Sequence, residues 1–172
     1  PKKTVEIGLV GKYVSLPDSY KSIAEAFIHA GASEEIDVKL KWIYSGDLEN
    51  GNVEDYLKDL DGILIAPGFG DRGIEGKITA AKYARENKIP LLGICLGMQI
   101  ITIEFARNVL GFEKANSMEF DDNSPYPVIS LMEEQKDVID KGGTMRLGAW
   151  KCELKPNTKI AEIYNAELIS ER

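Results

Sequence analysis

The segment LLGICLGMQ at residues 91–99 is the most informative about the fold, because a strand pattern, a cysteine and a helix pattern follow one another within it. Its apolar first half predicts a buried strand, and the helix pattern begins directly after Cys95. Gly93 and Gly97 leave the space that so tight a turn requires. A lone cysteine in an apolar run can also be a small buried hydrophobe. The flanking glycines favour a nucleophile elbow, in which the thiol projects from the sheet edge and the helix N-terminus favours its thiolate.

The segments around this stretch alternate between strand and helix patterns. Strands are predicted at residues 5–10, 36–44 and 62–66, and helices at residues 18–31, 52–60 and 77–87. The first helix should be capped by Asp18 or Ser19 and stopped by Ala30 and Gly31. This alternation predicts an α/β fold with a doubly wound, mostly parallel central sheet and helices on both faces. In such sheets, functional sites lie at the carboxyl ends of the strands.

The pattern changes after Gly111. Residues 128–132 and 144–150 have strand patterns, and the charged segment 133–143 joins them. We expect these strands to form a small antiparallel extension of the main sheet and not a second domain. The 172 residues would then form one domain of ordinary length.

The composition argues against several classes of function. Apolar residues make up 44% of the chain, enough for a globular core, and the formal net charge is −7. No basic stripe is present to neutralise phosphates, so we expect no nucleic-acid partner. No apolar run reaches the ~18 residues that span a bilayer, so we expect no membrane partner. The two cysteines, Cys95 and Cys152, lack paired spacing, which argues against disulfides and for a reducing, cytoplasmic location.

A glycine-rich loop, APGFGDRG at residues 66–73, ends another predicted strand and should reach the same crevice as Cys95. Attack by a thiol on an acyl group needs N–H donors for the oxyanion that forms. Gly68 is the candidate for one backbone donor, and Leu96, directly after the cysteine, is the candidate for the other. A purely structural turn is the alternative. Phosphate binding is disfavoured, because no Gly-Lys-Ser/Thr follows the loop.

These residues resemble a known family. GICLGMQ at residues 93–99 is similar to the nucleophile segment of the class I, triad-type glutamine amidotransferases. More narrowly, the chain resembles the glutaminase domain of CTP synthases over nearly its whole length. The segments that carry this likeness are GKY at 11–13, LPDSY at 16–20, GFGDRGIEGKI at 68–78, SMEF at 117–120 and GGTMRLG at 142–148. The resemblance implies a flavodoxin-like, three-layer fold.

The resemblance also implies an activity and the residues that perform it. The domain would hydrolyse the side-chain amide of L-glutamine through a thioester on Cys95 and pass ammonia to an N-terminal synthetase domain. That domain would aminate UTP to CTP with ATP and Mg²⁺, with GTP as allosteric activator, in a tetramer. No cofactor or metal is implied for the glutaminase domain itself. The oxyanion donors would be Gly68 and Leu96. The glutamine-binding positions would be Gly68, Phe69, Leu96, Gly97, Met98, Gln99 and Glu119.

Two departures from the family pattern change these expectations. Pro67 stands where the family has the first of two loop glycines, so any role of that amide is lost, while Gly68 keeps the second. The family's base and its orienting carboxylate lie in a His-x-Glu segment that this sequence lacks. The one histidine, His29, falls in the first predicted helix, where we expect it near the last carbonyls. We therefore expect a C-terminally truncated domain, without its synthetase domain and nearly inactive alone.

Two other functions stay open at this point. A different elbow-cysteine hydrolase of similar fold would share the strand–cysteine–helix turn. A catalytically silent, regulatory module of amidotransferase-like fold would account for the missing catalytic histidine.

Overall fold

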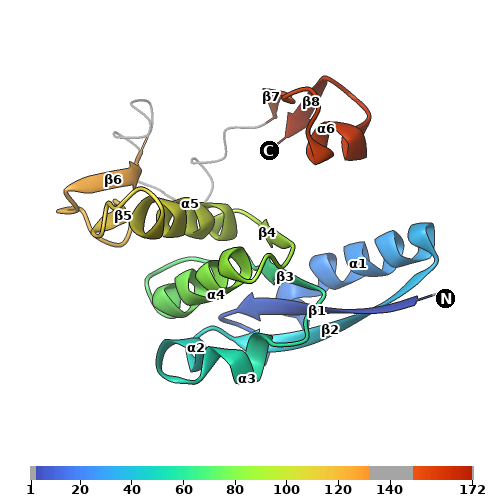
Figure 1. The fold of residues 1–172 in the computed structure, drawn as a ribbon, viewed down its shortest axis with the longest axis horizontal. Coiled ribbons are helices and arrows are strands. Elements are labelled where there is room, and N and C mark those ends of the chain that lie inside the picture. The colour runs from blue at the N-terminus through green and yellow to red at the C-terminus, as the bar shows by residue number, and fades with distance from the viewer. Residues whose placement is uncertain (1–2, 132–148, 172) are drawn as a thin grey trace. The chain divides into compact units, whose positions relative to one another are not determined.

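The computed structural model describes residues 3–131 and 149–171. The chain divides into two compact units, Pro1–Ser130 and Leu131–Arg172 (Figure 1). Every residue predicted to take part in the site belongs to the first unit.

The first unit is built on a four-stranded parallel sheet in the order β2-β1-β3-β4 (Figure 1). The strands are β1 (Lys3–Gly11), β2 (Ile36–Tyr44), β3 (Gly62–Ile65) and β4 (Leu91–Gly93). Each matches a predicted strand, and the parallel pairing confirms the predicted doubly wound α/β sheet. β3 is buried along its whole length, as expected of a short apolar run inside a parallel sheet.

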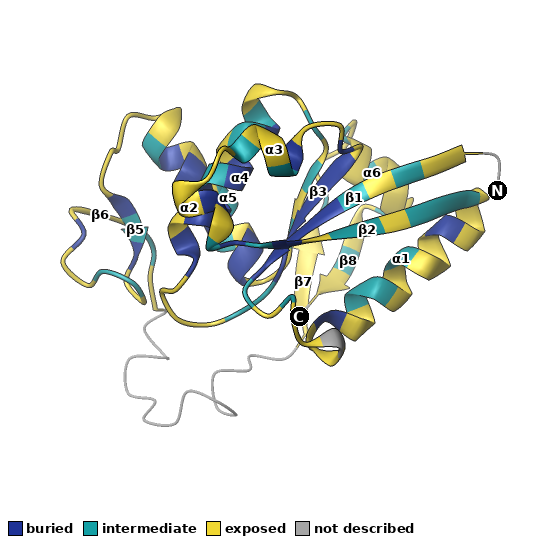
Figure 2. Ribbon diagram, turned by 90° about the horizontal axis from the view of Figure 1, so that it is seen from below, coloured by how far each residue is buried: buried dark blue, intermediate teal, exposed yellow. Residues whose placement is uncertain are grey.

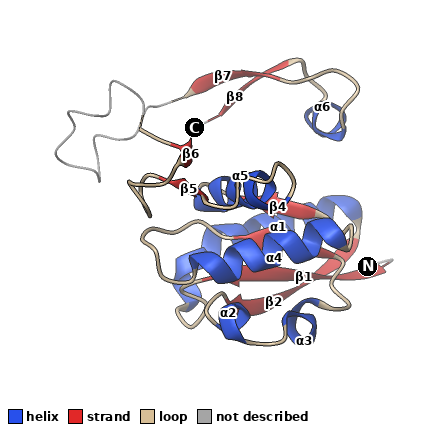
Figure 3. Cartoon of the chain, turned by 60° about the vertical axis from the view of Figure 1, so that its left-hand side comes forward, coloured by secondary structure: helices blue, strands red, loops and turns tan. Residues whose placement is uncertain are grey.

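Helices cover both faces of this sheet, as predicted (Figure 3). The helices of this unit are η1 (Pro17–Tyr20, a 3-10 turn), α1 (Lys21–Glu34), α2 (Asp47–Asn50), α3 (Val53–Leu57), α4 (Ile74–Glu86) and α5 (Leu96–Asn108). On one face, α1 packs Phe27 with Leu9 and Leu64. On the other face, α2, α3, α4 and α5 pack around Val10 and Ile65. Buried residues therefore concentrate on β1, β3, α4 and α5 (Figure 2). In the described parts of the chain, no helix is long and apolar enough to cross a membrane.

The first helix differs from its prediction at both ends. Asp18 and Ser19 lie in η1, and the N-cap of α1 is Tyr20, whose side chain makes no capping bond. The helix continues through Gly31 and ends at Glu35, which has a left-handed backbone with φ 56°. Gly31 serves close packing instead of stopping the helix, since a Cβ atom there would lie 2.6 Å from a carbonyl oxygen at the start of β2.

Two further pairs of strands lie outside the main sheet. In the first unit, β5 (Ala115–Ser117) pairs in parallel with β6 (Tyr126–Ile129). The predicted strand at residues 128–132 is thus β6, and the prediction that it extends the main sheet is wrong. Stacking of the Phe112 and Tyr126 rings, with centroids 4.7 Å apart, holds β6 against β5 instead.

In the second unit, β7 (Trp150–Glu153) pairs antiparallel with β8 (Leu168–Glu171), and α6 (Lys159–Tyr164) lies between them in the chain. A small antiparallel sheet is therefore present, as predicted. The predicted connection at residues 133–143, most of the predicted strand at 144–150 and the motif at 142–148 lie outside the described residues.

Candidate active site

Cys95 lies in the turn that joins β4 to α5, where the predicted elbow requires it. Its backbone has φ 55° and ψ −110°, a conformation that residues with a side chain rarely adopt. Backbone bonds hold the turn: among them, the Ile94 N–H donates to the Ile65 carbonyl at 3.1 Å, and the Met98 N–H donates to the Cys95 carbonyl at 3.0 Å. The thiol is free and exposed. A strained residue of this kind persists only where its surroundings fix it, and such residues cluster at functional sites.

The two flanking glycines allow β3, β4 and α5 to approach closely at this turn. A Cβ atom at Gly93 would lie 2.5 Å from the Gly97 carbonyl oxygen and 2.6 Å from the Met98 nitrogen. A Cβ atom at Gly97 would overlap the Ile65 carbonyl oxygen and lie 2.9 Å from the carbonyl carbon. The steric role predicted for both glycines is therefore confirmed.

The glycine-rich loop after β3 lies beside the first residue of α5. A Cβ atom at Gly68 would lie 3.6 Å from Leu96 Cδ2, so the structure brings these two residues together. Leu96 opens the helix, and the first N–H groups of a helix have no acceptor within it. Its side chain is only 3% exposed and anchors this end of α5 in the core.

Three side chains bind backbone groups of this loop, each from a different part of the fold. The bonds are Lys77 Nζ to the Ala66 carbonyl (3.2 Å), Lys12 Nζ to the Phe69 carbonyl (3.1 Å) and the Gly70 N–H to Glu119 Oε1 (3.4 Å). They tie the loop to α4, to the residue after β1 and to the segment after β5. The position of the loop beside α5 is therefore fixed by tertiary contacts.

The remaining predicted site residues differ in exposure. Phe69 and Met98 are 78% and 54% exposed, whereas Gly97 is buried. Gln99 is half-buried, and its Oε1 atom has no hydrogen-bond partner in the described part of the chain. Glu119 is exposed and bonded to the loop. A buried acceptor without a partner costs free energy, and Gln99 carries such an acceptor in the first turn of α5.

Sequence reasoning missed Lys77, which is 1% exposed and lies next to the loop. Burial lowers the pKa of Lys77 from 10.5 to about 8; the charge of Lys12 lowers this pKa too, and Cys95 raises it. A signal for this residue exists in the sequence. Lys77 shares the helical stripe of Ile74 and Ile78, where the period of an amphipathic helix calls for an apolar side chain.

His29 is exposed on α1 and lies far from the elbow in the fold. α1 covers the face of the sheet opposite to α5, so His29 and Cys95 belong to different faces. Because α1 runs on to Glu34, His29 lies more than one turn before its end, earlier than predicted. Within residues 3–131 and 149–171, no group of three His, Cys, Asp or Glu side chains could hold a metal ion.

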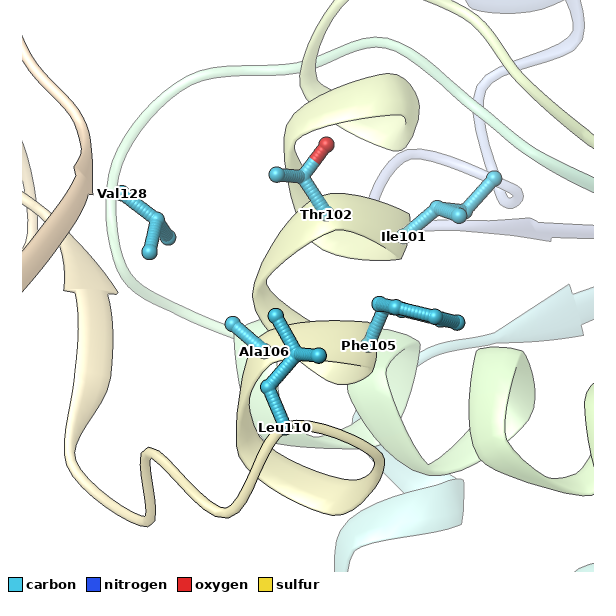
Figure 4. Close-up of a pocket in the computed structure, with 6 residues that line it drawn as sticks. All are labelled: Ile101, Thr102, Phe105, Ala106, Leu110 and Val128. Atoms are coloured by element: carbon cyan, nitrogen blue, oxygen red, sulfur yellow. The ribbon is translucent and has the colours of Figure 1, made fainter.

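A separate apolar hollow of about 370 Å³ lies along the second half of α5 (Figure 4). It is lined by Ile101, Thr102, Phe105, Ala106, Leu110 and Val128. Its one hydroxyl group, on Thr102, is already bonded to the Met98 carbonyl at 3.0 Å. None of the lining residues is a predicted site residue, so the candidate site is the sheet edge that carries Cys95 and Gly68.

A cysteine at a strand-to-helix elbow, on the carboxyl edge of a parallel sheet and next to backbone donors, defines the class of α/β proteins with a nucleophile elbow. Within that class, the family model described as "Glutamine amidotransferase class-I" matches residues 15–168. The chain belongs to the class I glutamine amidotransferase family.

Within this family, the chain is similar to CTP synthases. The chain is 61% identical to a CTP synthase of Flavobacterium johnsoniae and 62% identical to one of Flavobacterium psychrophilum, each over 172 residues that cover 100% of this chain and 32% of the relative. Among solved structures, the Trypanosoma brucei CTPS glutaminase domain with bound acivicin matches with a TM-score of 0.87 and 36% identity. That match covers 98% of this chain and 65% of the other chain. The chain thus spans about a third of the length of the curated relatives it matches.

Proposed function

We propose that this chain is the glutaminase domain of a CTP synthase and that it hydrolyses L-glutamine to glutamate and ammonia through a thioester on Cys95. One observation carries the proposal: an exposed thiol at a strained elbow, with Gly68 and Leu96 adjacent to it in the fold. The likeness to CTP synthases over the whole chain supports the choice of substrate.

In the proposed reaction, the Cys95 sulfur attacks the side-chain amide carbon of glutamine and forms a tetrahedral intermediate. The N–H groups of Gly68 and Leu96 would stabilise its negatively charged oxygen. When the intermediate collapses, the C–N bond breaks, the nitrogen takes up a proton and leaves as ammonia, and the glutamyl thioester remains. Water then attacks the thioester, which releases glutamate and returns the thiol.

The proton transfers need a base other than His29, because that side chain lies on the opposite face of the sheet. The family's His-x-Glu segment does not occur in these 172 residues. We expect the base and its carboxylate partner to come from that segment in the full-length protein. Residues 1–172 alone should therefore be nearly inactive.

Glutamine would be held by groups around the elbow. Glu119 is proposed to bind the α-ammonium group, because its exposed carboxylate stands next to the loop and offers a charge-assisted bond. Gln99 would accept an N–H bond through its unpartnered Oε1 atom. Phe69, Gly97 and Met98 would complete the substrate contacts, on the strength of the family resemblance.

The remaining steps of the proposal concern the parts of a CTP synthase that lie beyond this chain. An N-terminal synthetase domain would use the ammonia to aminate UTP to CTP with ATP and Mg²⁺, and GTP would act as an activator. The full-length enzyme would be a cytoplasmic tetramer. The names of the relatives and their roughly threefold greater length support this wider assignment. The free, exposed thiols of Cys95 and Cys152 suit a reducing compartment.

A catalytically silent regulatory module is the second candidate, and the position of His29 away from Cys95 favours it. A different elbow-cysteine hydrolase is the other alternative. A glutamine-analogue electrophile distinguishes a glutaminase from the other hydrolase, because a glutaminase should react with it at Cys95 far faster than with generic thiol reagents.

The direct test measures glutamate release by the full-length protein and by two cysteine variants. Cys152 provides the matched control, since it is also free and exposed but lies within β7 and not at an elbow. We expect Cys95→Ser to lose activity by on the order of a thousandfold or more, as for a removed nucleophile. Cys152→Ser should keep the wild-type rate. Near-normal glutamate release by Cys95→Ser would overturn the proposal, and an inactive wild type would favour the silent module.

A further inference from the structure

Lys77 places a buried ammonium group next to the glycine-rich loop, whose Gly68 lies beside Leu96, the residue after Cys95. It lies one turn into α4 and is 1% exposed. Its Nζ atom donates to the Ala66 carbonyl at 3.2 Å, and a Cβ atom at Gly68 would lie 3.6 Å from the same Nζ. Because burial of a charge costs free energy, we expect a lysine at this position to make an interaction that offsets this cost.

Lys77 carries its positive charge at neutral pH. Burial lowers the pKa of Lys77 to about 8, the charge of Lys12 acts in the same direction, and Cys95 acts in the opposite direction. Cys95 is therefore close enough for its charge to act on Lys77.

The charged groups on the elements packed against α4 include an ion pair of 3.0 Å between Glu75 of α4 and Arg107 of α5, two residues before Lys77. Glu49 of α2 approaches the backbone at Gly76, where its Cγ atom would lie 3.3 Å from a Cβ atom. The Arg85–Glu104 ion pair, 2.8 Å long, joins α4 to α5 two turns beyond Lys77. Lys77 therefore faces the glycine-rich loop, and Lys12 and Cys95 are the groups whose charges act on its pKa.

We propose that Lys77 is a positioning residue for the reaction at Cys95: it fixes the Ala66 carbonyl so that Gly68 stays beside Leu96, and its charge stabilises the anions formed at the elbow. The inference rests on the proposed function, because thioester chemistry creates those anions, first the thiolate and then the tetrahedral oxyanion. Lys77 acts through the loop and through its electric field, which the low dielectric of a buried site strengthens.

The test uses the full-length protein with three substitutions. Lys77→Met keeps an unbranched side chain one atom shorter and removes donor and charge, Lys77→Gln keeps a donor without the charge, and Lys77→Arg keeps both. Lys12→Met is the matched control, since Lys12 binds the same loop at Phe69 from a less buried position.

Two quantities are measured in each variant. The first is the pair kcat and KM for glutamine hydrolysis. The second is the rate of alkylation of Cys95 by iodoacetamide at pH 7, followed by mass spectrometry of the Cys95 peptide. The Cys152 peptide of the same digest is the internal reference for unspecific changes in reactivity.

We expect Lys77→Met to lower kcat about tenfold with little change in KM, because the lysine stabilises charge that develops in the transition state. Alkylation of Cys95 should slow in parallel, while that of Cys152 stays constant. In Lys77→Gln, kcat and the alkylation rate of Cys95 should fall nearly as far as in Lys77→Met. In Lys77→Arg both should stay near the wild-type values, and in Lys12→Met both should fall less than in Lys77→Met.

Wild-type kcat and alkylation rates in Lys77→Gln would overturn the proposal, and so would a loss in Lys77→Arg as large as in Lys77→Gln. If Lys77→Met fails to fold, shown by its circular dichroism, the Gln and Arg variants decide. If the wild-type protein hydrolyses no glutamine, the proposed function fails, and the alkylation rates still test the role of Lys77.

Discussion

Cys95 holds its thiol in place at a local cost in stability. Its φ of 55° lies in a region that residues with a side chain rarely occupy, and such a conformation costs about 1–3 kcal/mol. The close contacts that Gly93 and Gly97 permit keep the turn in this shape. A structural cysteine gains nothing from this strain, whereas a nucleophile gains a defined position beside its oxyanion donors.

Lys77 should make stability depend on pH in a predictable direction. Its pKa is about 8 in the folded protein against 10.5 when exposed, so between these pH values the unfolded chain binds more protons. The free energy of unfolding should therefore rise with pH in this window. Relative to Lys77→Met, which cannot titrate, the wild type should gain on the order of 3 kcal/mol between pH 7.5 and 10.5. Chemical denaturation of both proteins across this range measures the difference, and a difference that does not change with pH would contradict the buried charge.

Individual site residues differed in how far the sequence could predict them. The positions of Cys95, Gly68 and Leu96 followed from a motif and from the rule that strand ends meet at one edge. Glu119 was predicted only as a glutamine-binding position, from family resemblance, and its contact with the loop is seen only in the structure. Lys77 was missed although it interrupts the apolar stripe of its helix, because that irregularity alone does not show that the side chain reaches the loop after β3.

At the scale of elements, the packing of α5 on β3 places the elbow. Gly97→Ala should lower the free energy of unfolding by about 1–3 kcal/mol, because its Cβ atom would overlap the Ile65 carbonyl oxygen. Gly68→Ala is the matched control, since its Cβ atom would make only ordinary contacts at 3.6 Å. Chemical denaturation of the two variants measures the difference. Equal stability would contradict the close approach of α5 to β3.

Elements were predictable where the pattern within the element determined them. β2 has the predicted bounds, because alternation along the strand marks its half-buried surface. The predicted end of α1 was wrong. Gly31 is needed for the close approach of the helix to the backbone of β2, and the sequence alone does not show that contact. The partner of β6 was also wrong, because strand pairing is decided by contacts between distant segments such as Phe112 and Tyr126.

For the whole molecule, the elbow, the glycine-rich loop and the residues that hold them all belong to the first unit. This unit presents an exposed thiol and the candidate backbone donors, and it places His29 on the face of the sheet opposite to α5. We therefore propose that this chain supplies the bond-forming sulfur atom and that the base comes from another part of the full-length protein.

The most direct test of the central claim is to trap the covalent intermediate. Full-length protein is mixed with isotope-labelled glutamine, and the reaction is quenched in acid. The protein is then digested, and the masses of the cysteine-containing peptides are measured by mass spectrometry. The account predicts a labelled glutamyl group on the Cys95 peptide and none on the Cys152 peptide. Labelled glutamate formed at a normal rate by Cys95→Ser, or a glutamyl group carried by another residue, would contradict it.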